Sequence, residues 1–235
     1  MKLAVFGDSW TWGDELVDPR YFERDCCDVR NDQYRLEHCF SGRIAQHYNC
    51  EYENYGHPGA SLQSTVWTFL WWLQQDIKHE DYVVLVGLTA ADRQSWYNPD
   101  HVSYSNDPPW NKYIHSTWIN FGSSVVPEEW RKLGKDYLTL SHCDELSVFN
   151  YQQAVYFFDG IAKTKNLRLG QFNFYRQPTQ INASTLWWPE QNMQDYLYTL
   201  PNFKELHKPG HHPNENGHQI ISKRLITNID QYILT

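Results

Sequence analysis

The hydrophobic positions at the start of the chain form a short run, residues 2–6, that ends at Gly7-Asp8. A run of this length that ends in turn residues predicts a buried strand. Residues 82–88 are almost continuously apolar, which is typical of a parallel strand covered on both faces. We predict two further strands, over residues 51–55, ahead of a glycine-rich turn, and over residues 167–174.

Between these strands, apolar residues recur at the spacing of helices. Ser61 is a suitable N-cap for a helix that runs to about Lys78, and Asn214 is a suitable N-cap for the final helix. The first of these helices carries Leu62, Val66, Phe69, Leu70 and Leu73 on one face, and the last carries Ile220, Ile221, Leu225, Ile229 and Ile233. Further helices are predicted over residues 39–45, 127–138 and 144–165.

Strands that alternate with helices predict an α/β fold with a mostly parallel sheet. The mixed-charge residues 14–37 are expected to form a surface excursion, and the polar and aromatic residues 94–125 a long loop. No internal repeat or linker divides the chain. We therefore predict one domain over residues 1–235, with loop-rich insertions around 14–38 and 94–126.

The net charge of the chain argues against two classes of binding partner, nucleic acids and anionic lipids. Its 20 Lys and Arg against 28 Asp and Glu give a net charge of −8. Nucleic acids and anionic lipids need clustered Lys and Arg, so neither is an expected partner. Aromatic residues make up 16% of the chain, and Trp and Tyr suit cores, interfaces and sugar-like ligands equally well.

Export and membrane signals are not expected. The apolar start is shorter than a signal peptide needs, and no apolar stretch is long enough to span a bilayer. The 5 cysteines are odd in number and irregularly spaced, so we expect reduced thiols rather than a disulfide framework. These features favour a cytoplasmic location.

Candidate chemistry lies at the ends of the predicted strands, because reactive groups gather outside the carboxyl ends of parallel strands. Small polar residues and glycines follow three strands, at residues 7–13, 54–61 and 87–93. Another polar segment, residues 211–218, precedes the last helix. A Ser from the first segment and a His from the last could meet there, and Ser Oγ needs such a base to become a nucleophile.

The order of these segments resembles the SGNH hydrolases, also called the GDSL-like family, over essentially the whole chain. Gly7-Asp8-Ser9 matches the first block, and the extension Thr11-x-Gly13-Asp14-Glu15-Leu16 is similar to a common variant of it. Asn54-x-Gly56-x-x-Gly59-Ala60-Ser61 is similar to the second block, and His212-Pro213-Asn214-x-x-Gly217-His218 matches the last. The start is also similar to uncharacterised SGNH-like proteins of phage genomes, for which an association with virions is conceivable.

The resemblance implies a three-layer α/β/α sandwich of flavodoxin-like topology and the hydrolysis of carboxylic esters, among them lipid esters and sugar acetates. It implies that Ser9 is the nucleophile and His212 the base. The amides of Ser9 and Gly59 would form the oxyanion hole. We expect no cofactor and no metal, and the substrate would be a small-molecule or glycan ester.

Two positions depart from the family pattern. The third block normally carries Gly-x-Asn-Asp, whose Asn is an oxyanion donor, whereas this chain has Gly87-Leu88-Thr89-Ala90. Thr89 or Arg93 could take its place, and the plainer expectation is that both stabilise the loop, with Arg93, like Asp8, a candidate supporting residue of the site. The acid three residues before the histidine is replaced by Pro209, so a backbone carbonyl, Glu205 or Asp195 would have to hold His212.

These departures keep a second function open, a catalytically impaired SGNH-like domain that binds a glycan or a protein through aromatic loops. Each site residue also has a plainer interpretation: Ser9 as a turn residue, His212 as a packing or capping residue, Gly59 as a tight turn. Asp8 is expected to bond loop amides rather than react. A metal site among His207, His211, His212 and His218 is not favoured, because no Cys/His spacing fits a zinc site.

Overall fold

The computed structural model describes residues 1–20, 29–97, 118–121, 132, 136, 143–208 and 211–234. A four-stranded sheet lies at its centre in the order β2-β1-β3-β6, and every neighbouring pair is parallel. The strands are β1 (Lys2–Gly7), β2 (Tyr52–Gly56), β3 (Tyr82–Leu88) and β6 (Arg168–Asn173). All four predicted strands are confirmed, and their order is that of flavodoxin-like sheets.

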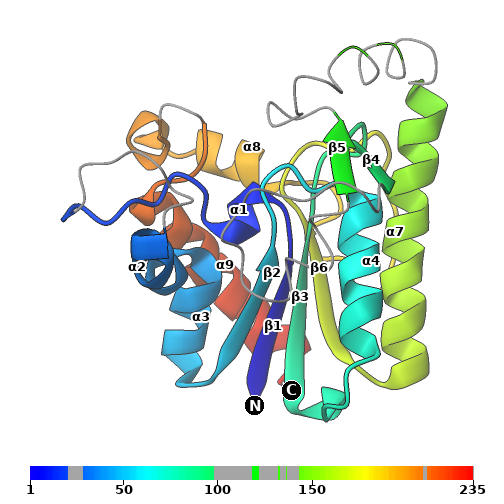
Figure 1. The fold of residues 1–235 in the computed structure, drawn as a ribbon, viewed down its shortest axis with the longest axis horizontal. Coiled ribbons are helices and arrows are strands. Elements are labelled where there is room, and N and C mark those ends of the chain that lie inside the picture. The colour runs from blue at the N-terminus through cyan, green and yellow to red at the C-terminus, as the bar shows by residue number, and fades with distance from the viewer. Residues whose placement is uncertain are drawn as a thin grey trace.

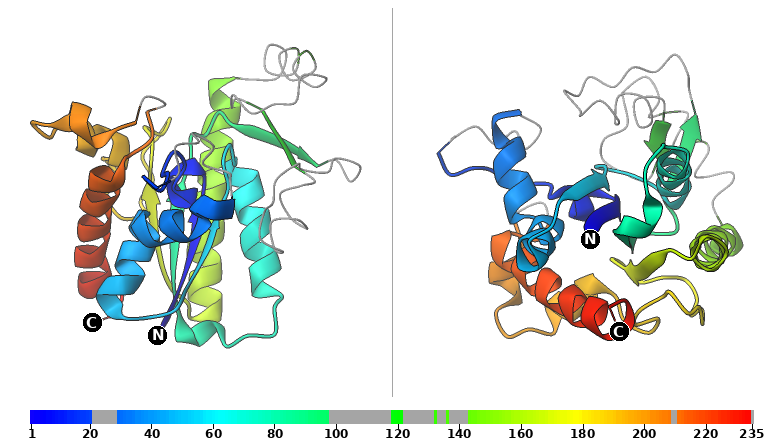
Figure 2. Two further views of the ribbon diagram at one scale, coloured as in Figure 1. Left: turned by 60° about the vertical axis from the view of Figure 1, so that its left-hand side comes forward. Right: turned by 90° about the horizontal axis from the view of Figure 1, so that it is seen from below.

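Helices cover both faces of the sheet, as Figures 1 and 2 show. The helices α3 (Phe40–Tyr48) and α9 (Glu215–Tyr232) pack on one face, and α4 (Leu62–Leu73) and α7 (Asp144–Lys165) on the other. Alternate residues of β1 point to opposite faces, with Leu3 and Val5 toward α3 and α9, and Ala4 and Phe6 toward α4 and α7. The predicted three-layer α/β/α architecture is confirmed.

Aromatic rings fill much of the layer between the sheet and α4. Phe6 stacks on Tyr55 with 4.9 Å between ring centres and meets Phe69 and Trp72 edge-on. Phe6, Phe69 and Trp72 are completely buried. Burial of each such side chain contributes about 1.5–3 kcal/mol relative to an exposed one. Part of the aromatic surplus therefore stabilises the core.

The predicted helix starts are confirmed by their caps. The Ser61 side chain accepts from the Ser64 amide, and the Ser64 side chain accepts in return from the Ser61 amide. The Asn214 side chain accepts from two amides of the first turn of α9. The helix after Ser61 ends at Leu73, so its predicted extension to residue 78 is wrong. The predicted helix over 144–165 has the bounds of α7.

The predicted surface excursion over residues 14–37 is wrong in part. A helix, α2 (Asp32–His38), lies in it, and Arg35 on that helix is only 1% exposed. The Arg35 guanidinium lies 3.3 Å from the ring centre of Trp12 and donates to the Trp12 carbonyl at 2.7 Å. An ion pair with Asp32 at 3.0 Å offsets the cost of burying the charge.

The predicted loop over 94–125 is also wrong in part, because β4 (Gln94–Tyr97) and β5 (Trp118–Phe121) pair antiparallel within it. The helix predicted over 127–138 lies almost wholly outside the described residues. Short helices that the pattern did not predict are α1 (Ser9–Trp12), α8 (Met193–Tyr198), η1 (Val29–Asn31), η2 (His79–Asp81) and η3 (Phe203–Leu206). The one-domain organisation stays a prediction. Among the described helices, none is long and apolar enough for a membrane crossing.

Candidate active site

Ser9 begins the short helix α1 directly after β1, at the carboxyl edge of the sheet (Figure 1). Asp8 caps this helix, and its Oδ1 accepts from the Trp10 amide at 3.0 Å. Gly13 ends the helix in the left-handed conformation, and its amide donates to the Ser9 carbonyl at 3.0 Å. The turn fixes the backbone of Ser9, whose side chain is 4% exposed.

The second predicted block packs against this turn. The Asn54 side chain donates to the Thr11 carbonyl at 2.8 Å and accepts from the Gly56 amide at 2.9 Å. Gly56 must be glycine, because a Cβ there would lie 2.4 Å from the Trp12 nitrogen. The close approach of β2 to α1 therefore depends on the Asn-x-Gly of the block.

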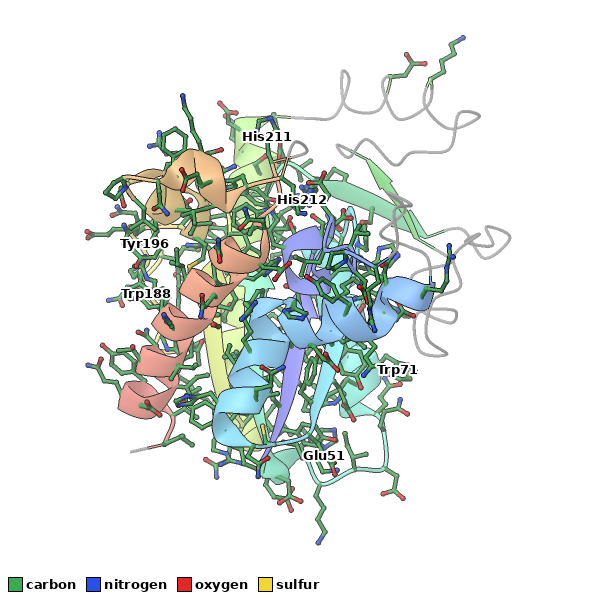
Figure 3. All side chains as sticks on the ribbon, turned by 90° about the vertical axis from the view of Figure 1, so that its left-hand side faces the viewer. Glu51, Trp71, Trp188, Tyr196, His211 and His212 are labelled. Atoms are coloured by element: carbon green, nitrogen blue, oxygen red, sulfur yellow. The ribbon has the colours of Figure 1, made fainter. Side chains whose placement is uncertain are left out.

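His212 reaches Ser9 from the loop that precedes α9. Its Nε2 lies 2.9 Å from Ser9 Oγ, across 203 residues of sequence. The loop is held by the Lys208 amide, which donates to the His212 carbonyl at 2.8 Å, and by the His211 amide, which donates back to Lys208 at 2.9 Å. Figure 3 shows His212 beside α1, with His211 further out. The structure thus brings together the two residues predicted as nucleophile and base.

Two carboxylates from the segment after α1 lie next to the His212 ring. Glu15 Oε2 lies 2.9 Å from Nδ1, and Asp14 Oδ2 lies 3.6 Å from Nε2. A carboxylate only accepts hydrogen bonds, so the contact with Glu15 assigns the proton to Nδ1. The lone pair of Nε2 then faces Ser9 and can accept its hydroxyl proton. Neither carboxylate was predicted to contact His212, although both belong to the extension of the first block.

Besides the Trp10 amide, Asp8 binds two side chains of the segment after β3. Its carboxylate is fully buried and its Oδ2 accepts from Thr89 Oγ1 at 2.6 Å and from Arg93 Nη1 at 2.9 Å. Burial is the largest single effect on the Arg93 guanidinium and by itself would lower its pKa, but Asp8, Tyr175 and Asp92 together outweigh it and the pKa is raised. Arg93, predicted as a supporting residue, therefore holds Asp8 as an ion pair.

Thr89 was predicted as an oxyanion donor, and for its hydroxyl this prediction is wrong. The hydroxyl has one proton, which it donates to Asp8, and its oxygen accepts from Arg93 Nη1 at 2.9 Å. Thr89 is also completely buried. Its side chain supports the Asp8 cap and does not replace the Asn of the family pattern.

The segment that carries Gly59 lies at the same edge of the sheet. Gly7 and Gly56 are register partners at the ends of β1 and β2, and the His57 amide donates to the Gly7 carbonyl at 3.0 Å. Gly59 has φ +77°, so it forms the tight turn that its plainer interpretation predicts. Among the described residues, no hydrogen-bond acceptor is found for its amide.

Tyr175 is a site residue that sequence reasoning missed. It follows β6, and its hydroxyl interacts with the side chains of Arg93 and Ser9. Burial and the charge of Asp8 raise the pKa of this phenol, so it stays neutral. Its ring also meets Trp10 edge-on with 5.6 Å between ring centres. Its place after the fourth strand is the signal that could have marked it, since parallel strand ends share one edge.

A polar pocket of about 240 Å³ opens beside Tyr175. Side-chain amides dominate its lining, with Asn173, Gln177, Gln180, Gln191 and Asn192. Asn173 is the last residue of β6 and pairs with Leu88 at the end of β3, so the pocket lies at the same edge as Ser9. Gln177 Nε2 donates to the Thr89 carbonyl at 2.9 Å, which ties the pocket to the Asp8 cluster.

Two other described histidines, His57 and His218, have structural roles. His218 of the last block is completely buried and accepts from the Phe40 amide at 3.2 Å. Burial lowers the pKa of His218 to about 3 and that of His57 to about 4, so both rings are neutral. Within the described residues, no three His, Cys, Asp or Glu side chains gather as they would around a metal ion.

Comparisons with known proteins find likeness only among solved structures. No family model and no curated protein matches the chain. One similar structure is a member of the lipolytic protein G-D-S-L family from Veillonella parvula, at 14% identity and TM-score 0.39, with 97% of both chains covered. Another is an alpha/beta hydrolase enzyme from the metagenome of Lake Arreo, at 15% identity and TM-score 0.45, covering 96% of this chain and 93% of that one.

A third similar structure is an acetyl xylan esterase from the rumen bacterium Butyrivibrio proteoclasticus, at 12% identity and TM-score 0.42. It is matched over 98% of this chain, which spans 63% of the esterase. With identities of 12–15% and TM-scores of 0.39–0.45, these likenesses carry no weight for the chemistry of the site. The argument for the chemistry of the site therefore rests on the residues and distances of this chain.

Proposed function

We propose that this chain is a serine ester hydrolase of the SGNH kind, with Ser9 as nucleophile and His212 as general base and acid. The observation that carries the proposal is the 2.9 Å between Ser9 Oγ and His212 Nε2, with a carboxylate on the opposite ring nitrogen. A nucleophile, a base and an orienting acid in hydrogen-bond contact are the arrangement that activates a Ser hydroxyl. An ordinary turn serine would not require it.

The reaction would follow the acyl-enzyme route. Ser9 Oγ attacks the ester carbonyl while its proton moves to His212 Nε2, and the tetrahedral intermediate collapses when the leaving alkoxide takes that proton. Water then attacks the acyl-enzyme, giving its proton to His212, which returns it to Ser9 Oγ as the acid leaves. The amides of Ser9 and Gly59 would stabilise the oxyanion.

The oxyanion hole is expected to be weaker than the family pattern provides. The Thr89 hydroxyl is committed to Asp8, so it adds no donor in place of the family's Asn. Loss of one oxyanion donor typically costs about 100- to 1,000-fold in rate. This observation favours the second candidate function, an impaired domain that binds a ligand without turning it over.

The polar pocket supports an ester whose alcohol part is a sugar. Its amide side chains offer donors and acceptors together, which suits the many hydroxyls of a saccharide better than an alkyl chain. Tyr175 lines the pocket and interacts with Ser9, so a sugar bound there would present its ester to the nucleophile. An acylated glycan is therefore the substrate class we propose.

Turnover of p-nitrophenyl acetate by the wild-type chain and by the Ser9→Ala variant tests the hydrolase. The Ser222→Ala variant is the matched control, because Ser222 lies on α9 and donates to the Gln219 carbonyl at 2.8 Å, away from His212. We expect activity to vanish in Ser9→Ala alone, and a fluorophosphonate probe to label Ser9. Equal turnover by wild type and Ser9→Ala would favour the binding module.

Substrate class is tested separately with acetylated saccharides. Gln180→Ala removes an exposed amide from the pocket. We expect a higher KM for the acetylated saccharide and an unchanged KM for p-nitrophenyl acetate, which needs no sugar site. A parallel change in both values would contradict the sugar site.

A further inference from the structure

The acid that contacts His212 comes from an unexpected part of the chain. The family resemblance would take it from three residues before the histidine, where this chain has Pro209. Instead, Glu15 Oε2 lies 2.9 Å from His212 Nδ1 and 3.4 Å from the His212 amide nitrogen. One carboxylate oxygen thus contacts both the ring and the backbone of the histidine.

The acids considered from sequence do not serve this position. The Glu205 side chain is exposed. Asp195 Oδ2 accepts from Asn192 Nδ2 at 2.9 Å, and the Asp195 amide donates to Asn192 at 2.8 Å, so Asp195 belongs to the cap of α8. Asp14 faces the other ring nitrogen of His212, at 3.6 Å, which is beyond a hydrogen bond.

The backbone of Glu15 is held in a conformation that the chain would otherwise avoid. Its φ is +64°, in the left-handed region that non-glycine residues seldom adopt. Such a residue costs on the order of 1–2 kcal/mol and persists only where its surroundings fix it. Here Leu16 is 1% exposed, and the Glu15 amide donates to Asp14 Oδ1 at 3.0 Å. Strained residues of this kind cluster at functional sites.

We propose that Glu15 is the positioning residue of the site, and that Ser9, His212 and Glu15 form a triad whose nucleophile and acid lie only six positions apart, at the start of α1 and just after its end. This rests on the hydrolase proposed above. Glu15 holds the proton on Nδ1, keeps Nε2 as the acceptor for Ser9, and stabilises the imidazolium once the Ser proton arrives. The family's lost acid is thereby replaced from the N-terminal side of the site.

The test compares Glu15→Gln, Glu15→Asp and Glu205→Gln with the wild-type chain. Glu15→Gln keeps the size of the side chain but removes the charge and allows the wrong ring tautomer. We expect kcat for p-nitrophenyl acetate to fall by about 100- to 10,000-fold with KM changed by no more than about threefold. Glu15→Asp restores a carboxylate and should recover part of kcat, and Glu205→Gln should match wild type.

A proton NMR spectrum supplies a readout that a merely structural role would not move. The wild-type chain should show a strongly deshielded proton on His212 Nδ1, and this resonance should be absent in Glu15→Gln and present in Glu205→Gln. Urea midpoints of all variants report whether they fold. If Glu15→Gln fails to fold, Glu15→Asp carries the test through kcat and the same resonance.

The outcomes separate this inference from the hydrolase itself. If turnover and labelling survive in Ser9→Ala, the proposed hydrolase mechanism with Ser9 as nucleophile is refuted, independently of the result for Glu15. Activity that is lost in Ser9→Ala but stays within threefold of wild type in Glu15→Gln, with the Nδ1 resonance intact, would overturn the role of Glu15 alone.

Discussion

The ion pair beneath Ser9 gives the sharpest test of how the nucleophile turn is held. Asp8 is completely buried, and the Arg93 side chain that pairs with it is 17% exposed. Replacing Asp8 by Asn preserves the shape of the cap but turns a carboxylate oxygen that accepts two hydrogen bonds into an amide that competes with both donors. The Arg93 charge is then left largely buried without a counter-ion.

The magnitude follows from that burial. Removing one partner of a buried ion pair costs about 3–5 kcal/mol, and the partial exposure of Arg93 places Asp8→Asn near the lower end, about 3 kcal/mol. Arg93→Met, which leaves the Asp8 charge unpaired, should cost a similar amount. The double variant removes both charges, so we expect it to cost about 3 kcal/mol in total, a coupling energy of about 3 kcal/mol.

Urea unfolding followed by tryptophan fluorescence measures all four members of this cycle, provided that the m-value stays constant. The exposed ion pair of Lys2 and Glu51 is the control, because its 2.7 Å separation is at least as short but both side chains are solvated. We expect no measurable coupling there. A coupling between Asp8 and Arg93 no larger than in this control would refute the reasoning.

Two further outcomes are expected. Burial lowers the pKa values of His57 and His218 to about 4 and about 3, below the value of about 6.5 for an unfolded histidine. Below about pH 6.5 the unfolded chain therefore binds more protons than the folded chain. As the pH falls from 7 to 5, each of the two rings should lower the free energy of unfolding by about 2 kcal/mol. In urea unfolding at pH 7 and pH 5, the free energy of unfolding of His218→Asn should fall by about 2 kcal/mol less than that of the wild-type chain. An equal fall in both would contradict the neutral, buried state assigned to His218. Gly56→Ala places a Cβ 2.4 Å from the Trp12 nitrogen, so we expect displacement of the Ser9 turn, a fall in kcat of at least about tenfold and a lower urea midpoint; wild-type kcat would argue against this close approach.

Sequence predicted the fold well because its signals are local. The apolar run at 82–88 became a strand with every residue buried, and the capping side chains of Ser61 and Asn214 mark true helix starts. Errors arose where burial depends on a distant partner. Arg35 is buried because Trp12 covers its guanidinium, and nothing in the sequence around Arg35 indicates that contact.

The same limit applies to the candidate site: residues within local motifs could be identified from sequence, but their long-range contacts could not. The blocks around Ser9 and His212 identified two residues that the fold brings into contact. Glu15 belongs to the extension of the first block, but its contact with His212 depends on a left-handed turn that sequence does not indicate for a glutamate. Thr89 was misassigned because the destination of a single hydroxyl proton is set by Asp8, 81 residues away.

Ser9 and His212 are 203 positions apart in the sequence, so their contact forms only when the two ends of the α/β layers have come together. During synthesis Ser9 and Glu15, the proposed nucleophile and acid, emerge early, whereas His212, the proposed base, follows only after all four strands of the central sheet have been made. A nascent or truncated chain that stops before residue 212 would hold Ser9 and Glu15 without a proton acceptor between them. If refolding is followed through the proposed esterase activity, we expect this activity to return with the docking of the segment before α9 and to lag behind the burial of tryptophans in the sheet layers.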